Sequence, residues 1–174
     1  MGRTAENNCL VVDSPQDARE GFCEVRPPWS AGTDMKFMVV YPLPWDFQTS
    51  AIYQNSPGIP ITAGLVVPNA AIAPSLGRNL SACPAATGAC NANVTVEIIP
   101  PRSMFEARLQ QVDLRVSRAF RLGGSRRVRG NFDVYNVLNA SNVLNMNTAY
   151  GPTWTNVLQI LSGRLLRVGA QFDF

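Results

Sequence analysis

The stretch QQVDLRVSRAFRL, residues 110–122, alternates apolar and polar side chains along its whole length. A period of two residues is typical of a β-strand with two unlike faces. The stretch is longer than the ~5–6 residues of an average soluble strand, and it reaches the ~9–11 residues that a strand needs to cross a bilayer. The apolar positions are Val112, Leu114, Val116, Phe120 and Leu122. This segment predicts a long antiparallel strand, with its even-numbered face apolar and its odd-numbered face polar.

Four other segments continue the pattern, and together they predict an all-β, antiparallel up-and-down meander of about five long strands. The strands are expected near 35–41, 46–54, 109–122, 126–138 and 162–174. Between the third and fourth strands lies GGS, a turn sequence. A three-residue turn at 123–125 would place Leu122 opposite Arg126. It would also place Arg115 opposite Asp133, as a cross-strand ion pair on the polar face.

The connections alternate between short and long. Short turns are expected at 42–44, where prolines should end the first strand, and at 123–125. Long loops are expected at 55–107 and 139–161. Short turns on one side and long loops on the other are typical of outer-membrane barrels. Aromatic residues gather near the short turns, as in an interfacial girdle; they are Tyr41, Trp45, Phe47, Phe120, Phe172 and Phe174.

Composition excludes several classes of function. Histidine is absent from the 174 residues, which rules out Ser-His-Asp and Cys-His nucleophiles and the HExxH zinc helix. No catalytic, cofactor-binding or metal site is expected, and Asp113 and Asp133 are interpreted as structural partners of nearby arginines. Residues 102–174 hold ten basic and four acidic side chains. No aromatic stacking platform accompanies these arginines, so we expect Arg118 and Arg126 to reach lipid phosphates rather than nucleic acid.

The four cysteines form two local pairs, Cys9 with Cys23 and Cys83 with Cys90. Neither pair has zinc-ligand spacing, so two short-range disulfides are expected, with four free thiols as the alternative. The first pair lies in residues 1–34, an irregular, extracellular-type loop. The second lies in the long loop at 55–107. Disulfides at these places would limit the freedom of long loops in an oxidising compartment.

The C-terminal part of the sequence resembles the end of the barrel of TonB-dependent receptors, most nearly the Oar-like group with a carboxypeptidase-regulatory-like domain. The resemblance rests on NFDVYNVLNASNVLN at 131–145, NTAYGPTW, ILSGR and the terminal RVGAQFDF. The AAIAPSLGRNL and RLQQVDLRVSRAFRLG stretches fit the same group. The resemblance spans 35–174 and is strongest from 109 onward. It implies a bacterial outer-membrane receptor for ligand uptake that works with the TonB complex.

The sequence also departs from that family. It shows no plug and no TonB box, and about five strands cannot close a barrel, since the smallest need about eight. We therefore expect the chain to be the C-terminal segment of a longer protein that supplies the plug and the other strands. The expected partners are those missing strands and plug, outer-membrane lipid, the TonB complex and the barrel assembly machinery. Phe172 and Phe174 are the expected assembly signal, because outer-membrane barrels commonly end in an aromatic residue.

A different class of protein remains open. Disulfides and long loops are also found in secreted β-sandwich modules for binding or adhesion. Such a module would stay in the aqueous phase, whereas a barrel would need detergent. The transported ligand is not indicated by any residue, so substrate-binding positions are unknown.

Overall fold

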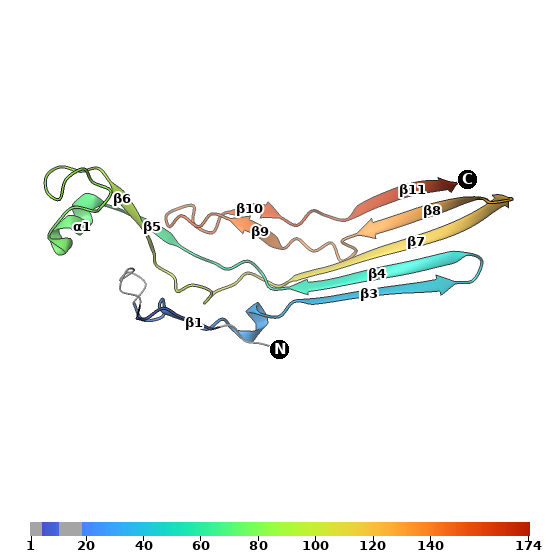
Figure 1. Cartoon of the computed structure of the whole chain (residues 1–174), viewed down its shortest axis with the longest axis horizontal. Helices are drawn as coiled ribbons and strands as arrows, with labels where there is room; N and C mark the ends of the chain where they lie inside the picture. The colour runs from blue at the N-terminus through green and yellow to red at the C-terminus, as the bar shows by residue number, and fades with distance from the viewer. Residues whose placement is uncertain (1–4, 11–18) are drawn as a thin grey trace. The chain divides into compact units, whose positions relative to one another are not determined.

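The structure is a computed structural model that describes residues 5–10 and 19–174. The chain is predominantly β, with antiparallel sheets, and it divides into two compact units. We call one the sheet unit; it consists of Trp29–Ile59, Glu106–Leu144 and Gln159–Phe174. We call the other the loop unit; it consists of Met1–Pro28, Pro60–Phe105 and Asn145–Leu158. Each is described by itself (Figure 1).

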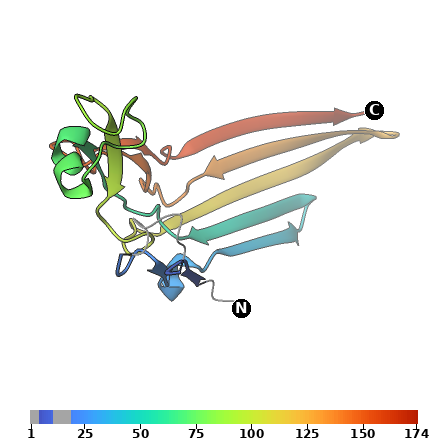
Figure 2. The same ribbon diagram turned by 60° about the vertical axis from the view of Figure 1, so that its left-hand side comes forward.

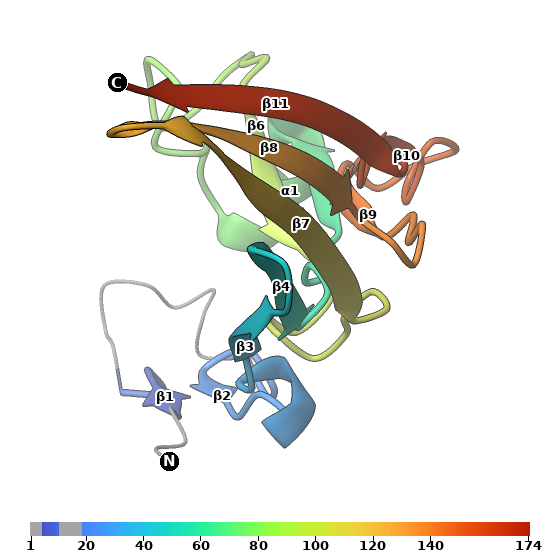
Figure 3. The ribbon, with the colours of Figure 1, turned by 90° about the vertical axis from the view of Figure 1, so that its right-hand side faces the viewer.

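The sheet unit contains one five-stranded sheet. Its strands are β3 (Met35–Leu43), β4 (Phe47–Ser56), β7 (Leu109–Gly123), β8 (Arg126–Tyr135) and β11 (Leu165–Asp173). They lie side by side in the order β11-β8-β7-β4-β3, each antiparallel to its neighbours (Figure 3). This is the expected meander of long antiparallel strands. Among the described residues, β3 and β11 are edges, so the sheet is open rather than closed into a barrel.

The register between β7 and β8 is the predicted one over most of the hairpin. Arg115 lies opposite Asp133 and Arg121 lies opposite Arg127. The prediction was wrong at the tip, because Arg126 pairs with Gly123 instead of Leu122, which forms a β-bulge. The turn is therefore two residues plus a bulge, not three residues. Gly123 has a φ of 98°, a left-handed conformation that favours glycine.

The prediction that prolines end the first strand was also wrong by two residues. Pro42 lies inside β3, opposite Gln48, and the turn occupies 44–46. Proline is tolerated there because β3 is an edge strand, where a missing N–H need not cost a ladder hydrogen bond. Trp45 and Asp46 make the turn with φ values of 63° and 60°. Figure 1 shows this turn, the β7–β8 turn and the C-terminus at the same end of the sheet.

Strand β8 ends at Tyr135, three residues before the expected end. Asn136 takes a φ of 51° and its side-chain nitrogen donates hydrogen bonds to the carbonyl oxygens of Ala140 and Ser162. Asparagine tolerates this left-handed conformation better than most residues. The chain therefore leaves the sheet at Asn136, and β11 begins at Leu165 rather than at 162.

The segments 55–107 and 139–161, expected as loops, contain short regular elements. Strands β5 (Gly64–Pro68) and β6 (Asn93–Glu97) form a hairpin, and helix α1 (Asn69–Leu76) lies between them in sequence. Strands β9 (Val143–Met146) and β10 (Val157–Ile160) form another pair, as do β1 (Glu6–Asn7) and β2 (Glu24–Val25). A 3₁₀ turn, η2, covers Trp29–Ala31. Among the described residues, no helix has the length and apolar character needed to cross a membrane.

Candidate functional site: the two faces of the sheet

One face of the sheet is apolar across all five strands. The register aligns odd-numbered residues of β3 and β4 with even-numbered residues of β7, β8 and β11. We call this surface the apolar face. Its large side chains are Met35, Phe37, Val39, Tyr41, Leu43, Phe47, Tyr53, Leu114, Val116, Phe120, Val128, Phe132, Val134, Leu166, Val168 and Phe172. No carboxylate lies among these positions of the five strands.

The apolar face is uncovered. Phe37 is 60% exposed, Phe132 is 44% exposed and Val168 is 80% exposed. Each Å² of apolar surface withheld from water contributes about 25 cal/mol, so a soluble sheet normally buries such a face. Among the described residues, none of the buried hydrophobic side chains belongs to these five strands. Residues 5–10 and 19–174 therefore leave this apolar surface exposed. Figure 2 shows the sheet as a single twisted layer.

The opposite face, which we call the polar face, carries a two-pronged ion pair at its centre. The guanidinium of Arg115 donates from Nε to Oδ1 of Asp133 and from Nη2 to Oδ2, the latter at 3.1 Å. Asp133 is 3% exposed, and Arg167 on β11 occupies the position opposite it on the other side. The contact expected between Arg115 and Asp133 is thus present. A bidentate arginine–carboxylate pair fixes both side chains as well as compensating their charges.

Near the β7–β8 turn, the facing arginines Arg121 and Arg127 each have a carboxylate of their own. Arg121 Nη2 lies 3.2 Å from Oδ1 of Asp46 in the β3–β4 turn. Arg127 Nε lies 3.9 Å from Oδ2 of Asp173 at the end of β11. Carboxylates from neighbouring strands therefore compensate the two like charges at this end of the sheet. The sequence of the β7–β8 hairpin alone could not predict this, because Asp46 and Asp173 belong to other parts of the sheet.

Asp113 does not form the ion pair that was expected for it. Its Oδ1 accepts a hydrogen bond of 2.8 Å from the backbone N–H of Asn136 and one of 2.9 Å from the side-chain nitrogen of Gln111. The carboxylate thus holds the chain where it leaves β8. This role could not be predicted from the sequence, because it depends on the backbone conformation of Asn136.

The aromatic residues predicted to form a girdle lie toward the turn end of the sheet. Phe120 on β7 and Phe172 on β11 both lie opposite Val128, one on each side of β8. Phe172 is 68% exposed and Phe174, the last residue, is 99% exposed. Trp45 in the β3–β4 turn is 81% exposed. Exposed aromatic rings at one level of a sheet suit a membrane–water interface.

One cation lies among these rings on the apolar face. The guanidinium carbon of Arg118 is 4.7 Å from the ring centre of Phe47 and 4.8 Å from that of Phe120. At these distances the ring electrons attract the charge. The prediction that Arg118 points to the apolar side is consistent with its register position opposite Gly130.

The edge strand β3 departs from the alternation because it is apolar on both faces. Met38 and Val40 belong to the polar face by register, opposite Ile52 and Ser50. They are 69% and 46% exposed. The polar face is therefore mostly polar over β4, β7, β8 and β11, with Ile52 and Leu165 among the exceptions, whereas on β3 it carries Lys36 beside Met38, Val40 and Pro42.

At the end of the sheet opposite the turns, Arg108 holds several segments together. Its Nε donates to Oδ1 of Asn55 at 2.7 Å, its Nη2 donates to the carbonyl oxygen of Thr33 at 2.7 Å, and its Nη1 donates to that of Ser30. Asn142 donates from its side-chain nitrogen to the Arg108 carbonyl oxygen at 2.9 Å. Sequence reasoning missed this cluster, since its members are far apart in the chain and show no shared motif.

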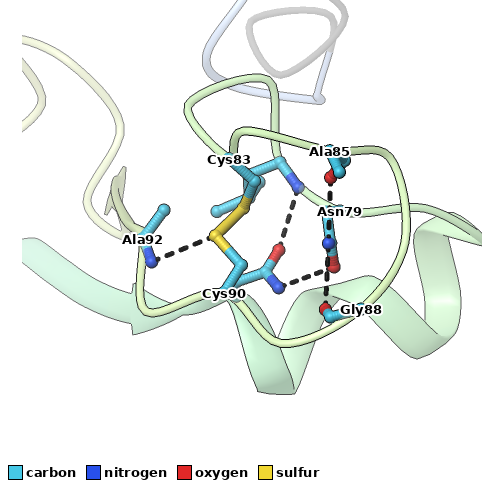
Figure 4. Close-up of a disulfide and its surroundings, with 8 residues drawn as sticks. Asn79, Cys83, Ala85, Gly88, Cys90 and Ala92 are labelled. Carbon is cyan, nitrogen blue, oxygen red and sulfur yellow. Dashed lines mark hydrogen bonds between the residues drawn. A yellow bond between two sulfur atoms is a disulfide. The ribbon is translucent and has the colours of Figure 1, made fainter.

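In the loop unit, the disulfides are Cys9–Cys23 and Cys83–Cys90, the pairing that their spacing favoured. The second closes a loop around Asn79, which is 6% exposed. Its side-chain nitrogen donates to the carbonyl oxygens of Ala85 and Gly88 at 3.0 and 3.1 Å (Figure 4). Its side-chain oxygen accepts from Asn69 at 2.9 Å. A buried asparagine with all these partners gives the loop a defined shape.

Within residues 5–10 and 19–174, no three side chains of the His, Cys, Asp or Glu types gather as metal ligands would. Comparisons with family models, with curated proteins and with solved structures found no match to this chain. The functional interpretation therefore rests on the two faces of the sheet.

Proposed function

We propose that this chain is the C-terminal barrel segment of a TonB-dependent receptor of the bacterial outer membrane, which takes up a ligand and is not functional without its remaining strands and plug. The observation that carries the membrane part of the proposal is the continuous, exposed apolar face. Hydrocarbon chains of lipid would cover that face along its whole length.

The polar face supports the same proposal. A barrel lumen contains water, so it accommodates exposed guanidinium groups and paired carboxylates such as Arg115 and Asp133. A dry protein core would not. The open edges at β3 and β11 also need partners, because lipid offers no hydrogen bonds to unpaired backbone groups. Further strands of the same barrel would provide these partners.

The transport role itself is proposed from the resemblance of the C-terminal motifs to TonB-dependent receptors. In that role, the barrel segment forms part of the channel wall, and the plug and long loops select the ligand. The chain's own part would be structural: it contributes strands, girdle residues and the terminal strand that the assembly machinery reads.

A secreted β-sandwich module is the second candidate, and the two disulfides favour it. In such a module a second sheet, from another segment or molecule, would cover the apolar face. The polar face would then contact bulk water. The two candidates therefore differ in what touches the apolar face: lipid tails or protein.

Site-directed cysteine labelling distinguishes them. Cysteines at Val116, Phe132 and Val168 in the full-length protein, inserted in outer membranes, should resist a water-soluble maleimide and react with a membrane-soluble one. Cysteines at Ser117, Asn131 and Gln171 should react with the water-soluble reagent through the lumen. Each residue of the first set has a matched control on the same strand but the other face.

Fractionation gives the complementary result. The full-length protein should sediment with outer membranes, resist extraction with sodium carbonate and dissolve in detergent. Recovery of the protein in the aqueous fraction would favour the sandwich. The cysteines at Val116, Phe132 and Val168 would then resist the water-soluble maleimide only while the protein is folded. If the water-soluble reagent labelled the apolar set rather than the polar set, the assignment of the two faces would be wrong. A shift of one residue in the register would produce that result.

A further inference from the structure

The apolar face is not smooth, because a shallow groove, open to one side, interrupts it at the level of the aromatic girdle. Gly130 on β8 forms its floor, opposite Arg118 on β7 and Ala170 on β11. Phe120 and Phe132 line it, and its volume is about 340 Å³. That volume falls in the lower part of the ~300–1,000 Å³ range of small-molecule sites. Glycine inside a strand often marks a place where a ligand approaches the backbone.

No rule of backbone geometry requires glycine at this position. A Cβ built on Gly130 would have its nearest contact at 4.0 Å, from Cε2 of Phe120, which is an ordinary van der Waals distance. The φ of Gly130 is also outside the left-handed region. Its absent side chain therefore leaves space that a larger residue could fill without strain.

Arg118 places one positive charge in this groove, at the level of Gly130. Its guanidinium is held against Phe47 and Phe120, and among the described residues it has no carboxylate within salt-bridge distance. Stacking on ring faces leaves the N–H groups at the edge of the guanidinium free to donate. Arginine donors match the geometry of phosphate oxygens particularly well.

On the side of the Arg118 row that faces away from the turns, the groove is lined by apolar side chains, as the acyl chain of a lipid requires. The Arg118 row lies nearer the turns, at the level of Phe47. The next row away from the turns contains Val116, Phe132 and Val168, all apolar. A molecule with a phosphate at the girdle and a hydrocarbon chain directed toward the bilayer centre would meet complementary groups at both ends.

We infer that this groove is a specific phospholipid site, in which Arg118 binds the headgroup phosphate and one acyl chain runs from Gly130 past Val116 and Phe132. The inference rests on the proposed membrane location of the apolar face and goes beyond it, because a general lipid-facing surface needs neither a groove nor an unpaired cation. The site would fix one lipid molecule at the barrel wall while the surrounding lipids exchange freely.

Native mass spectrometry of the full-length protein in detergent tests this. The delipidated protein is titrated with dioleoyl phosphatidylglycerol, with dioleoylglycerol, which has the same chains without phosphate, and with glycerol 3-phosphate, which has the phosphate without chains. The phospholipid should bind one to one, and both halves alone should bind at least about tenfold more weakly, since each lacks one of the two recognised groups.

Two variants remove the two halves of the site. Arg118→Gln removes the charge and Gly130→Leu fills the groove, and each should weaken phosphatidylglycerol binding about tenfold or more. Arg129→Gln and Ala119→Leu change a facing pair of residues on the polar face in comparable ways, away from the groove lining, and should leave binding unchanged within about twofold. Arg118→Lys keeps the positive charge but loses the planar guanidinium. Its affinity for phosphatidylglycerol should therefore fall between that of the parent protein and that of Arg118→Gln.

The outcomes separate this inference from the proposed function. An integral membrane protein whose Arg118→Gln and Gly130→Leu variants bind phosphatidylglycerol as the parent does would overturn the lipid site alone. Equal binding of glycerol 3-phosphate would replace it with a simple anion site, and equal binding of dioleoylglycerol would reduce it to nonspecific apolar contact. A full-length protein that never enters the membrane would overturn the proposed function and, with it, this site.

Discussion

Among the described residues, the loop unit buries apolar side chains together with Asn69 and Asn79, whereas the sheet unit buries only polar ones. In the loop unit the buried residues include Cys23, Val25 and Met146, at 7%, 7% and 4% exposure. In the sheet unit they include Ser117, Asp133 and Asn136, at 7%, 3% and 3%. Large apolar side chains of the sheet are exposed instead. The loop unit follows the pattern of a protein in water, and the sheet unit inverts it.

This difference shows that the two units depend on different sources of stability. Disulfides, buried asparagines and a small apolar cluster hold the loop unit together from within. The backbone ladder holds the sheet unit, whose apolar face contributes free energy only when its surroundings are apolar. Changes in the sheet should therefore affect insertion and stability in the membrane, whereas changes in the loop unit should act locally.

Deletion of Phe174 should have the largest effect, on the amount of protein inserted. If the assembly machinery reads the terminal strand, the deletion should remove most of the protein from the outer membrane, while Phe174→Tyr should be tolerated. A girdle residue alone would cost only ~1.5–3 kcal/mol of burial, which a large barrel can lose. Protease accessibility of surface loops measures insertion, and normal levels in the deletion variant would rule out the signal.

A charge on the apolar face should come next. Phe132→Arg, one row from Arg118 on the apolar face, should destabilise the inserted protein by roughly 1–3 kcal/mol, because the ~2–4 kcal/mol cost of an arginine facing lipid at the bilayer centre falls to ~0–1 kcal/mol at the interfaces. Asn131→Arg, one residue earlier and on the other face, should cost much less because it enters a wet lumen. Urea titration of the protein in lipid vesicles measures both, and equal costs would remove the distinction between the faces.

Removal of the second disulfide should act only within the loop unit. The Cys83→Ser, Cys90→Ser double variant should lower the local stability of residues 79–92 by about 2–3 kcal/mol, from the loop-closure entropy of so short a loop. Hydrogen exchange should rise there, while exchange in β7 and β8 stays the same. Asn79→Ala, which removes the loop's buried centre, should give the same local pattern; faster exchange in β7 would show that the units are not independent.

Breaking the central ion pair should have the smallest effect. Arg115→Met leaves the buried carboxylate of Asp133 without its main partner and should cost about 1–3 kcal/mol, the usual penalty for an unsatisfied buried group. The matched change Arg127→Met removes the longer, more exposed contact with Asp173 and should cost less than about 1 kcal/mol. Urea midpoints in vesicles compare them, and the reverse order would mean that burial does not determine the value of these pairs.

Much of the sheet could be predicted because its physics is local and repetitive. Alternation identified the strands, and parity together with the turn expected at 123–125 placed Arg115 opposite Asp133, where the structure has it. The predicted length of the turn was wrong, but the predicted faces were right. A bulge at Leu122 followed by a two-residue turn keeps the same side chains on each face as a three-residue turn would. The prediction that the first strand ends before Pro42 was wrong because a proline is tolerated in an edge strand, and the sequence does not show which strand lies at an edge.

The rest depends on contacts between residues far apart in the chain. Helix α1 contains Pro74, which argues against a helix in sequence. The Asn69–Asn79 contact and the hydrogen bonds of Arg108 to Asn55 and Thr33 leave no periodic trace. Such clusters become visible only when the backbone has brought their members together.

Strand β3, apolar on both faces and open along one edge, has a consequence for the time before assembly. An extended, unpaired segment rich in β-branched and aromatic residues is a template to which identical segments of other molecules can add, in the manner of amyloid. Under the proposed function, the residues that would face lipid in the assembled barrel would therefore promote aggregation while the chain is still in water. Holding chaperones would have to shield Met35–Leu43 from the moment of synthesis, and a charged residue at Val40 should slow aggregation of the unfolded chain.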